Sequence, residues 1–453
     1  MRGKRVLEDL KIIDSEFPNI GIGKNEEGFP IYVKNALQGQ TVKVKLGRKK
    51  EDRIEAKLLE VVERSPMEKE SQCIHFSECG GCTYQRLDYD EELNYKLRQI
   101  NNLFVHGEID HKMSEIIPSP KYTNYRNKME YTFGDEYKDG PLSVGLHARG
   151  RFHDIVNTSR CEIVHDDFNV IREGIREYFE GIGVSYYKRR LHEGSLRHLV
   201  VRRGEYTKEI LLNLVTTSDV DFDMEAFVEY IKSVELEGEV VGIIHTINDS
   251  LGDAITPEKV ELLYGRDYFY EEILGLRFKI SPFSFFQTNT KSAEVLYSKA
   301  LGFISELDDK IVFDLYSGTG TISQIAGLKA KKVYGIEIVE EAVVAARENA
   351  KLNGLKNVEF LAEDVLTGVD KLEAKPDVVI IDPPREGINP KAINKIIDFD
   401  PEEFLYISCN PKTFVRDLKV FMERGYKIKE SVVVDQFPRT SHVETIALLQ
   451  RDI

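Results

Sequence analysis

Short apolar runs alternate with amphipathic helical segments in the last third of the chain. This alternation begins at about residue 285. It is typical of an α/β fold, in which helices cover both faces of a mostly parallel sheet. The predicted strands are, in order, IVFDLY (311–316), KVYGIEI (332–338), VEFL (358–361), DVVIID (377–382), FLYISC (404–409) and HVETIALL (442–449).

A glycine-containing turn joins the first of these strands to a predicted helix. In FDLYSGTGTIS (313–323), Gly318 and Gly320 let the backbone approach a ligand at the sheet edge where such folds bind nucleosides. Glu337 ends the next predicted strand, where a carboxylate can accept both hydroxyls of a ribose. This part of the chain therefore predicts the opening βαβ unit of a doubly wound, Rossmann-like domain.

The residues around this turn distinguish between nucleoside ligands. A dinucleotide site usually has a third glycine, but Ser323 occupies that position. Asp314, at the end of the first strand, is unfavourable beside a pyrophosphate but favourable beside an ammonium and a sulfonium, which S-adenosylmethionine carries. Asp364 ends the third strand, where we expect the adenine. The sequence thus favours S-adenosylmethionine over a nicotinamide dinucleotide.

Two prolines follow an acidic residue at the end of the fourth predicted strand. Asp382, Pro383 and Pro384 lie at the same carboxyl edge of the sheet. Because proline fixes φ and has no N–H, the pair predicts a rigid loop with few donors, which suits a flat substrate. The alternative interpretation is an ordinary turn at the end of a strand.

Cys409 lies where an apolar run gives way to Asn410 and Pro411, which suit the cap and the first position of a helix. A thiol before a helix N-terminus is stabilised as the thiolate, its nucleophilic form. We therefore expect either a nucleophile or a small buried side chain at this position. The local sequence alone favours the buried side chain, because unreactive buried cysteines are common.

The four other cysteines predict a metal site. Cys73, Cys79 and Cys82 are close together, whereas Cys161 stands far from them in the sequence. Four thiolates can hold a tetrahedral zinc ion or a [4Fe–4S] cluster. Structural zinc sites more often use two close pairs, so this spacing favours the cluster over zinc.

Length and composition favour about three domains without a membrane span. The chain has 453 residues, of which 42% are hydrophobic and 31% charged. The pattern predicts an OB-like β-barrel at 1–64, a β-rich central domain at 65–284 and an α/β catalytic domain at 285–453. A predicted helix near 90–105 can pack on the catalytic domain. Without a bilayer-spanning apolar run or a secretory signal, we expect a cytoplasmic location.

The charge pattern is mixed with respect to nucleic acid. The net charge of −15 is unfavourable for binding phosphates. Each basic run by itself is best interpreted as a solvated face, but several in the N-terminal half together favour RNA. These runs are KVKLGRKK (43–50), YYKRR (186–190), Arg197, Arg202 and Arg203.

The motifs resemble, in their order, those of the RNA 5-methyluridine methyltransferases, specifically the 23S ribosomal RNA (uracil-5-)-methyltransferases. The resemblance extends over nearly the whole chain, and residues 1–64 resemble the TRAM domain of that family. It implies a class I, S-adenosylmethionine-dependent methyltransferase of 23S ribosomal RNA, with a [4Fe–4S] cluster on the four cysteines, no membrane and no obligate protein partner. The motifs are SFFQTN (284–289), DLYSGTGT (314–321), IE (336–337), IDPPREG (381–387), SCNP (408–411) and HVET (442–445).

The resemblance also implies individual roles, and it reverses the local interpretation of Cys409. It makes Cys409 the nucleophile and Glu444 the base, while Gln287, Tyr316, Glu337 and Asp382 contact S-adenosylmethionine.

The chemistry explains why these residue types are needed. Uracil C5 is a poor nucleophile until a thiolate adds to C6 and creates an enolate that can attack the methyl group. A base must then remove the C5 hydrogen so that elimination frees the enzyme. Glu444 is an acid in an apolar strand, where an unpaired charge is costly, although an edge-strand carboxylate facing water is the alternative. His442 lies two residues away, and we expect it to pack.

Three other functions compete with this interpretation. The first is a tRNA 5-methyluridine methyltransferase, a class that usually lacks the barrel and the cluster cysteines. The second is an RNA-binding protein with an inert catalytic half, and the third is a nicotinamide-dependent enzyme, which the incomplete glycine pattern disfavours. The expected contacts to the RNA backbone are Lys43, Lys45, Arg48, Lys49, Lys50, Arg126 and Lys128.

Overall fold

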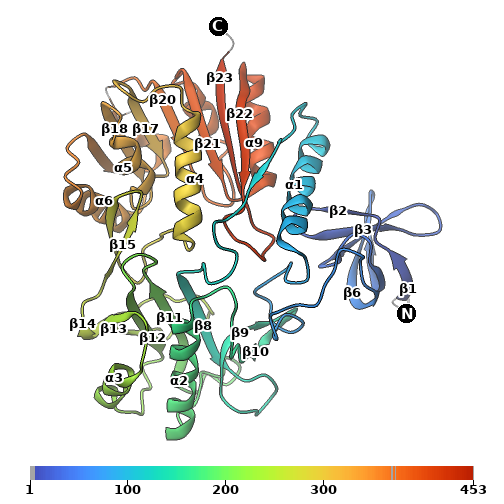
Figure 1. Cartoon of the computed structure of the whole chain (residues 1–453), viewed down its shortest axis with the longest axis vertical. Coiled ribbons are helices and arrows are strands. Elements are labelled where there is room, and N and C mark those ends of the chain that lie inside the picture. The colour runs from blue at the N-terminus through green and yellow to red at the C-terminus, as the bar shows by residue number, and fades with distance from the viewer. Residues whose placement is uncertain (1–5, 369–370, 373, 452–453) are drawn as a thin grey trace.

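The computed structural model describes residues 6–368, 371–372 and 374–451. Most of its strands belong to three sheets that follow one another along the chain. Figure 1 shows the central and C-terminal sheets along the long axis of the molecule and the N-terminal sheet projecting to one side. This architecture confirms the predicted α/β fold with additional β-rich regions.

The N-terminal sheet has six strands in the order β1-β5-β6-β4-β3-β2, all antiparallel except for the β4–β6 pair. Alternate residues of the strands are buried, as expected for a sheet with one solvated face. The core includes Ile31, Val33, Val42 and Val44. The strands are β1 (Val6–Lys11), β2 (Asp14–Glu16), β3 (Ile20–Lys24), β4 (Pro30–Lys34), β5 (Thr41–Lys49) and β6 (Ile54–Glu63).

The next segment links the N-terminal sheet to the C-terminal sheet. Residues 65–88, which carry three cysteines, form no regular helix or strand and lead into α1 (Tyr89–His106). Helix α1 packs on α9 (Pro411–Glu423), where the rings of Phe104 and Phe414 are 6.4 Å apart between centroids. Strand β7 (Ile116–Ile117) then pairs in parallel with β22 (Tyr426–Val434), so an early part of the chain completes the C-terminal sheet.

The central sheet has seven strands in the order β10-β9-β8-β11-β12-β13-β14 and is antiparallel except between β12 and β13. Two helices, α2 (Asp166–Ile182) and α3 (Met224–Ser233), bury their apolar faces against it. Figure 1 shows them on the side turned away from the C-terminal sheet. The strands are β8 (Lys128–Gly134), β9 (Ser143–Ala148), β10 (Arg151–Val156), β11 (Leu196–Arg203), β12 (Glu209–Thr216), β13 (Glu239–Ile247) and β14 (Lys259–Gly265).

The C-terminal sheet has eight strands in the order β19-β18-β17-β20-β21-β23-β22-β7. Strands β17 to β21 are parallel, and β23 runs antiparallel to its neighbours β21 and β22. The strands not yet given are β17 (Ile311–Leu315), β18 (Lys332–Glu337), β19 (Val358–Ala362), β20 (Val378–Ile381), β21 (Glu403–Ser408) and β23 (Glu444–Arg451).

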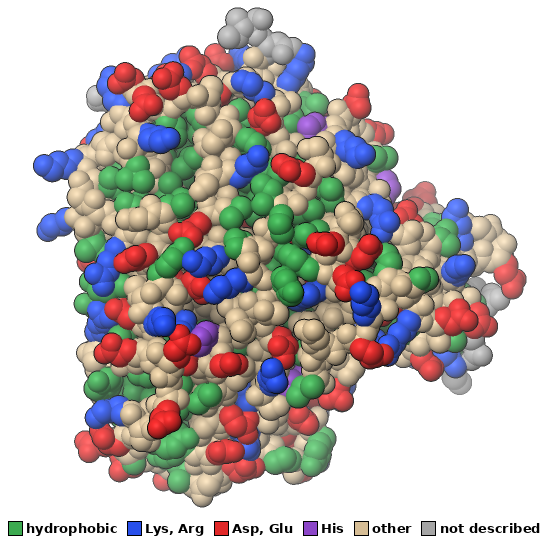
Figure 2. All heavy atoms as spheres, viewed as in Figure 1, with side chains coloured by type: hydrophobic (Ala, Val, Ile, Leu, Met, Phe, Trp, Pro, Cys, Tyr) green, Lys and Arg blue, Asp and Glu red, His purple; other side chains and the backbone are tan. Residues whose placement is uncertain are grey.

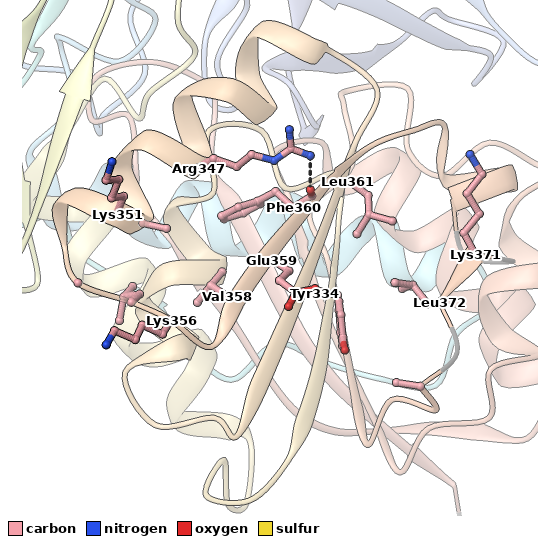
Figure 3. Close-up of a pocket in the computed structure, with 14 residues that line it drawn as sticks. Tyr334, Arg347, Lys351, Lys356, Val358, Glu359, Phe360, Leu361, Lys371 and Leu372 are labelled. Atoms are coloured by element: carbon pink, nitrogen blue, oxygen red, sulfur yellow. Dashed lines mark hydrogen bonds between the residues drawn. The ribbon is translucent and has the colours of Figure 1, made fainter.

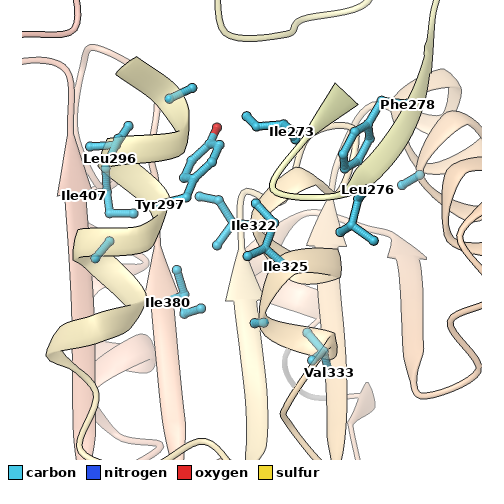
Figure 4. Close-up of a cluster of buried hydrophobic side chains, with 14 of the residues drawn as sticks. Ile273, Leu276, Phe278, Leu296, Tyr297, Ile322, Ile325, Val333, Ile380 and Ile407 are labelled. Atoms are coloured by element: carbon cyan, nitrogen blue, oxygen red, sulfur yellow. The ribbon is translucent and has the colours of Figure 1, made fainter. Parts of the chain in front are cut away.

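Helices cover both faces of this sheet, which explains why its strands are continuous apolar runs. All four residues of β20 are fully buried, because alternate side chains enter the cores on opposite faces. One face packs on α4 (Thr290–Phe303), α5 (Thr321–Gly327), α6 (Glu340–Leu352) and a hairpin of β15 (Phe269–Ile273) with β16 (Leu276–Ile280). Figure 4 shows this core, in which Tyr297 of α4 lies near Ile322 of α5 and Leu296 lies near Ile407 of β21.

The other face packs on helices from both ends of the chain. It holds α1, α8 (Ile393–Ile397) and α9. A short helix, α7 (Val365–Gly368), follows β19. Within the described residues, no helix is both long enough and apolar enough to cross a bilayer. The division of the chain into domains at residues 64 and 284 stays a prediction.

Candidate active site

The order of the C-terminal sheet reverses at β17, whose two neighbours are β18 and β20. In doubly wound sheets, ligands bind at the carboxyl ends of the strands beside such a reversal. The predicted site residues lie at this edge: Tyr316 follows β17, Glu337 ends β18, Asp382 follows β20 and Cys409 follows β21. Because β23 is antiparallel to β21, its first residue, Glu444, also lies at this edge.

The glycine turn after β17 is shaped by two requirements. Gly320 has φ 75°, and a Cβ there would lie 2.5 Å from the ring of Phe360, so any other residue is both strained and too large. The N–H of Gly318 donates to Glu337 Oε2 at 3.0 Å, and Val339 N–H donates to Oε1 at 2.9 Å. Each oxygen of the Glu337 carboxylate therefore accepts a hydrogen bond from the backbone, which fixes the position of the side chain.

A cavity of about 460 Å³ opens beside this turn. Tyr316 and Glu337 line it, as do Asp364 from the end of β19 and Pro384 and Asn389 from the loop after β20. Three of the residues expected at the nucleoside, Tyr316, Glu337 and Asp364, therefore share one cavity. Asp382, directly after β20, and Gln287, in the loop between β16 and α4, do not line it.

Two aspartates at this edge are suited to a cationic ligand. Burial raises the pKa of Asp314 to about 7, against hydrogen bonds from Ser323. Its Oδ1 is buried without a hydrogen-bond partner. Burial, followed by the charge of Asp314, also raises the pKa of Asp382 to about 7. A sulfonium or ammonium group would stabilise both carboxylates, so the residues present fit S-adenosylmethionine.

Gln287 lies in the loop between β16 and α4, and residues from three parts of the chain fix this loop. Asn127 Nδ2 donates to the Gln287 carbonyl at 3.0 Å, and Gln436 Nε2 lies 3.4 Å from Gln287 Oε1. Thr319, in the glycine turn, donates to the Phe285 carbonyl at 3.3 Å. The Gln287 loop and the glycine turn are therefore adjacent.

Cys409 and Glu444 lie at the ends of neighbouring strands. Each is one residue beyond the pair Ser408–Thr445, and Thr445 Oγ1 donates to the Ser408 carbonyl at 3.0 Å. Glu444 is 3% exposed on an interior strand, which excludes the alternative of an edge-strand carboxylate facing water. Burial, followed by the charge of Asp382, raises the pKa of Glu444 well above its usual value.

The expectation that the helix N-terminus makes Cys409 a thiolate is wrong for the protein without RNA. Burial and the charges of Glu444 and Asp382 raise the pKa of Cys409 to about 12, and Arg385 opposes them. The two carboxylates and the loss of water outweigh the first turn of α9. These surroundings therefore favour the protonated thiol at neutral pH.

His442 lies before β23 rather than on it, so it does not share a strand face with Glu444. Its Nδ1 is 3.3 Å from Arg385 Nη2, and burial followed by the charge of Arg385 lowers its pKa to about 4. It is thus a neutral, partly buried ring at neutral pH. Its packing beside Arg385 agrees with the expected structural role.

Three residues near the site were missed by sequence reasoning. Arg385 directly follows the two prolines, and this position in the motif could have identified it. Tyr297 forms a hydrogen bond with Gln287, and burial followed by the charge of Asp382 raises its pKa. In the sequence, its spacing along the helix is that of a core residue. Gln436 carries no sequence signal of its own.

The four remaining cysteines converge. Cys73, Cys79, Cys82 and Cys161 line one cavity together with apolar side chains such as Ile163. All of them are free thiols. Burial and the mutual proximity of the sulfurs raise the pKa of Cys79 and Cys82, and that of Cys161 reaches about 11.

Within the described residues, no group of three or more His, Cys, Asp or Glu side chains is placed to hold a metal ion. The donor set itself, four thiols around one cavity, is the kind that holds a zinc ion or an iron–sulfur cluster.

Three of the arginines that were expected to favour RNA binding are buried and bonded within the protein. Arg197 donates to the carbonyls of Asn248 and Ser250 at 2.6 Å, and Arg203 donates to Asp167 at 2.7 Å. Arg202 donates to the carbonyl of Pro282 at 3.1 Å and to that of Ser284. All three are at most 5% exposed, so their assignment to an RNA-binding surface is wrong. Figure 2 shows basic and acidic side chains interspersed on one face of the molecule.

A second cavity, of about 950 Å³, borders the edge strand β19 and helix α6. Figure 3 shows Arg347 donating to the Phe360 carbonyl, at 2.6 Å, with Lys351 and Lys356 at the rim. None of the predicted site residues lines it. The larger cavity is therefore separate from the residues that carry the expected chemistry.

Comparisons with known proteins show the family of this chain. The family model for tRNA (uracil-5-)-methyltransferase matches residues 258–452. An uncharacterized RNA methyltransferase of Clostridium tetani is 48% identical over 98% of this chain and 97% of its own length. One from Bacillus cereus is 35% identical over 99% of this chain and 97% of its own length.

A solved structure is similar over nearly the full length. It is the tRNA (uracil-54, C5)-methyltransferase of Pyrococcus abyssi in complex with S-adenosyl-L-homocysteine, which is 28% identical, with a TM-score of 0.78. The match covers 97% of this chain and 100% of that chain. The present chain belongs to the RNA (uracil-5-)-methyltransferase family, whose members are S-adenosylmethionine-dependent enzymes.

Proposed function

We propose that this enzyme methylates C5 of a specific uridine in 23S ribosomal RNA, through a covalent adduct with Cys409. The observation that carries the proposal is the placement of Cys409 and Glu444 one residue beyond the same strand pair, at the sheet edge that also carries the cavity with Tyr316 and Glu337. A thiol and a carboxylate are the two groups that C5 methylation of uracil requires.

In the first half of the reaction, the sulfur of Cys409 bonds to C6 and the C5–C6 π electrons move into an enolate. Cys409 is half-buried, so its proton can leave to water as the uridine enters. Arg385 opposes the charges that disfavour the thiolate. The enolate carbon C5 then takes the methyl group of S-adenosylmethionine, whose sulfur keeps the bonding electron pair.

In the second half, the Glu444 carboxylate accepts the C5 proton, the C5–C6 double bond forms again and the C6–sulfur bond breaks. The buried environment that raises the pKa of Glu444 makes its carboxylate a stronger base than an exposed one. Gln287, Tyr316, Glu337 and Asp382 hold the methyl donor in this proposal.

We propose a [4Fe–4S] cluster for the four-cysteine cavity. Cys73, Cys79, Cys82 and Cys161 would supply its thiolate ligands and so fasten an irregular segment to the central sheet. The cluster would have no part in methyl transfer. By resemblance to the family, the N-terminal sheet would be a TRAM domain that contributes to RNA binding. We also propose that the enzyme acts in the cytoplasm.

A tRNA is the second candidate substrate, because the similar Pyrococcus abyssi enzyme is named for uridine 54 of tRNA. That enzyme matches 97% of this chain, so the N-terminal sheet and the cysteine segment do not by themselves exclude a tRNA substrate. Transcripts of 23S ribosomal RNA and tRNA, offered at equal concentration with labelled S-adenosylmethionine, distinguish the two. Methylation of tRNA alone would overturn the ribosomal proposal.

The mechanism is tested with RNA that contains 5-fluorouridine. Because fluorine cannot leave as a cation, elimination stalls and a protein–RNA adduct should survive denaturing electrophoresis. Cys409→Ala should form none, and Glu444→Gln should accumulate an adduct on ordinary RNA. Glu403→Gln is a matched control, since Glu403 is a 3% exposed carboxylate at the far end of the β21–β23 pair. An adduct with Cys409→Ala would disprove the role of that sulfur.

A further inference from the structure

The connection between β22 and β23, residues 435–443, carries the chain to Glu444 and is held by residues from the N-terminal third. Asp435 accepts from Lys96 Nζ at 2.7 Å and from the Tyr89 hydroxyl at 2.9 Å. The Tyr125 hydroxyl donates to the Pro438 carbonyl at 2.8 Å. The position of this connection thus depends on α1 and on the segments that flank it.

Arg439 makes the largest number of these contacts. Its N–H donates to Glu92 Oε1 at 2.7 Å, and its Nη1 donates to Glu92 Oε2 at 3.2 Å and to the Leu87 carbonyl at 2.8 Å. Its own carbonyl accepts from the N–H groups of Thr83 at 2.7 Å and Tyr84 at 3.0 Å. Arg439 is therefore bonded on both sides to a segment that begins directly after Cys82.

The ionic contacts of Arg439 belong to a buried group of four charges. Lys96 and Glu92 are at most 1% exposed, and Lys96 Nζ donates to Glu92 Oε1 at 2.7 Å. Arg439 and Lys96 balance the carboxylates of Glu92 and Asp435. Removing one member of such a group leaves an uncompensated buried charge, so the geometry is tightly specified.

The nucleophile rests on a different framework. Asn410, next to Cys409, caps α9 through Lys412 N–H, and its Nδ2 donates to the Arg385 carbonyl at 2.8 Å. Thr413 Oγ1 lies 3.4 Å from the same carbonyl. These contacts lie within the C-terminal sheet and its helices, and Arg385 also lies 3.3 Å from His442 of the 435–443 connection. Arg439 and its partners Glu92, Thr83 and Tyr84 take no part in them.

We propose that Arg439 is a positioning residue for the second half of the reaction: it fixes the 435–443 connection so that Glu444 reaches the C5 proton of the methylated adduct. This inference rests on the proposed function. Arg439 does not touch the reacting atoms. Because its carbonyl is bonded to Thr83 and Tyr84, it also transmits the placement of the Cys82 segment to the base.

Two substitutions of Arg439 test the proposal. Arg439→Lys keeps a charge but loses the planar fork, and Arg439→Asn tolerates the left-handed backbone at φ 68° without the charge. Turnover should fall about 10- to 100-fold, as expected for a misplaced base, with Arg439→Lys the milder of the two. An adduct should accumulate on ordinary RNA, while the rate of adduct formation on 5-fluorouridine RNA stays within about twofold of wild type.

The matched control is Arg451, at the far end of β23. It also makes an ion pair, with Asp400 at 2.8 Å, and lies over the ring of Tyr426 at 5.0 Å. Arg451→Lys and Arg451→Asn should leave turnover and adduct level unchanged. Tyr89→Phe, which removes one hydrogen bond to Asp435, should shift the adduct level in the same direction as Arg439→Lys even if both Arg439 variants fail to fold.

The outcomes separate the two proposals. If wild-type protein forms no adduct with 5-fluorouridine RNA of either kind, the proposed function fails and the role of Arg439 fails with it. If wild type forms the adduct but the Arg439 variants turn over normally, the positioning role alone is overturned. The same holds if these variants lose adduct formation and turnover to the same extent. If the Arg439 variants do not fold, an unchanged adduct level in Tyr89→Phe overturns it.

Discussion

Cys409 and Glu444 lie at the same end of a strand pair, each one residue beyond Ser408 and Thr445, and the charge of Glu444 contributes to raising the pKa of Cys409. In the proposed reaction, the sulfur adds to one carbon of the ring and the carboxylate takes a proton from the next carbon, so both groups must stand on fixed, neighbouring supports. Two hydrogen-bonded interior strands provide such supports, because their spacing cannot change without breaking the sheet.

Affinity for S-adenosylmethionine should depend on pH near neutrality. Asp314 and Asp382 have a pKa of about 7, so both are ionised and attract the cationic ligand above that pH and are neutral below it. Isothermal titration from pH 8 to pH 5.5 should show affinity falling with pH, by up to about tenfold per pH unit for each group.

S-adenosylhomocysteine, which lacks the sulfonium charge, should show a weaker pH dependence. Asp382→Asn should reduce the dependence for S-adenosylmethionine and lower the affinity at pH 8. Equal affinity at pH 5.5 and pH 8 would contradict the assignment of these carboxylates to the sulfonium and ammonium groups.

Gly320→Ala should destabilise the protein more than Gly354→Ala. Both glycines have a left-handed φ, of 75° and 69°, so both substitutions cost about 1 to 2 kcal/mol from backbone strain. At Gly354 an added Cβ meets nothing within 4 Å, whereas at Gly320 it meets Phe360 at 2.5 Å. Urea unfolding should therefore show an additional loss of about 1 to 3 kcal/mol for Gly320→Ala. Equal losses would mean that the ring moves aside at no cost.

Iron content should depend on four of the five cysteines. Anaerobically purified protein should contain iron and absorb broadly near about 400 nm. Replacing Cys82 or Cys161 with serine should remove the iron and the absorbance, while Cys409→Ser is the matched control and should keep both. Protein without iron, or with iron that survives loss of Cys82, would contradict the cluster assignment.

The basic strip of β5 should contact RNA, and the buried arginines of β11 should not. Arg48 and Lys49 are exposed, so their double replacement with alanine should weaken RNA binding and lower the salt slope by about 0.7 to 0.9 per lost phosphate contact. Lys351 and Lys356, at the second cavity, provide a matched double variant that should change neither.

Arg202→Lys should lower thermal stability while the salt dependence of RNA binding stays the same, because Arg202 donates hydrogen bonds to two backbone carbonyls inside the protein. A reduced salt slope for this variant would restore Arg202 to the RNA-binding surface.

The sequence predicted those features that are local. Apolar runs that end in Tyr316, Asp382 and Cys409 indicated both the parallel sheet and the edge that carries the site, because strand ends and glycine turns are set by neighbouring residues. It also indicated that Glu444 is costly to bury, and the structure places it at 3% exposure.

The features that could not be predicted depend on contacts between distant segments. Burial, followed by the charges of Glu444 and Asp382, raises the pKa of Cys409, and an argument from the neighbouring helix alone cannot include these effects. The sequence around Arg202 indicated a surface charge, because its hydrogen-bond partners, the carbonyls of Pro282 and Ser284, lie about 80 residues away in the chain. The parallel pairing of β12 with β13 inside an otherwise antiparallel sheet likewise has no sequence signature.

The contact between α1 and the end of the chain has a consequence for biosynthesis. Lys96 and Asp435 are 339 residues apart, and β7 finds its partner strand only in the last tenth of the sequence. At the usual speed of translation, the segments that cover the apolar face of α1 are synthesised roughly 20 to 70 seconds after the helix itself. A nascent chain of this enzyme therefore exposes this apolar face until its final strands leave the ribosome.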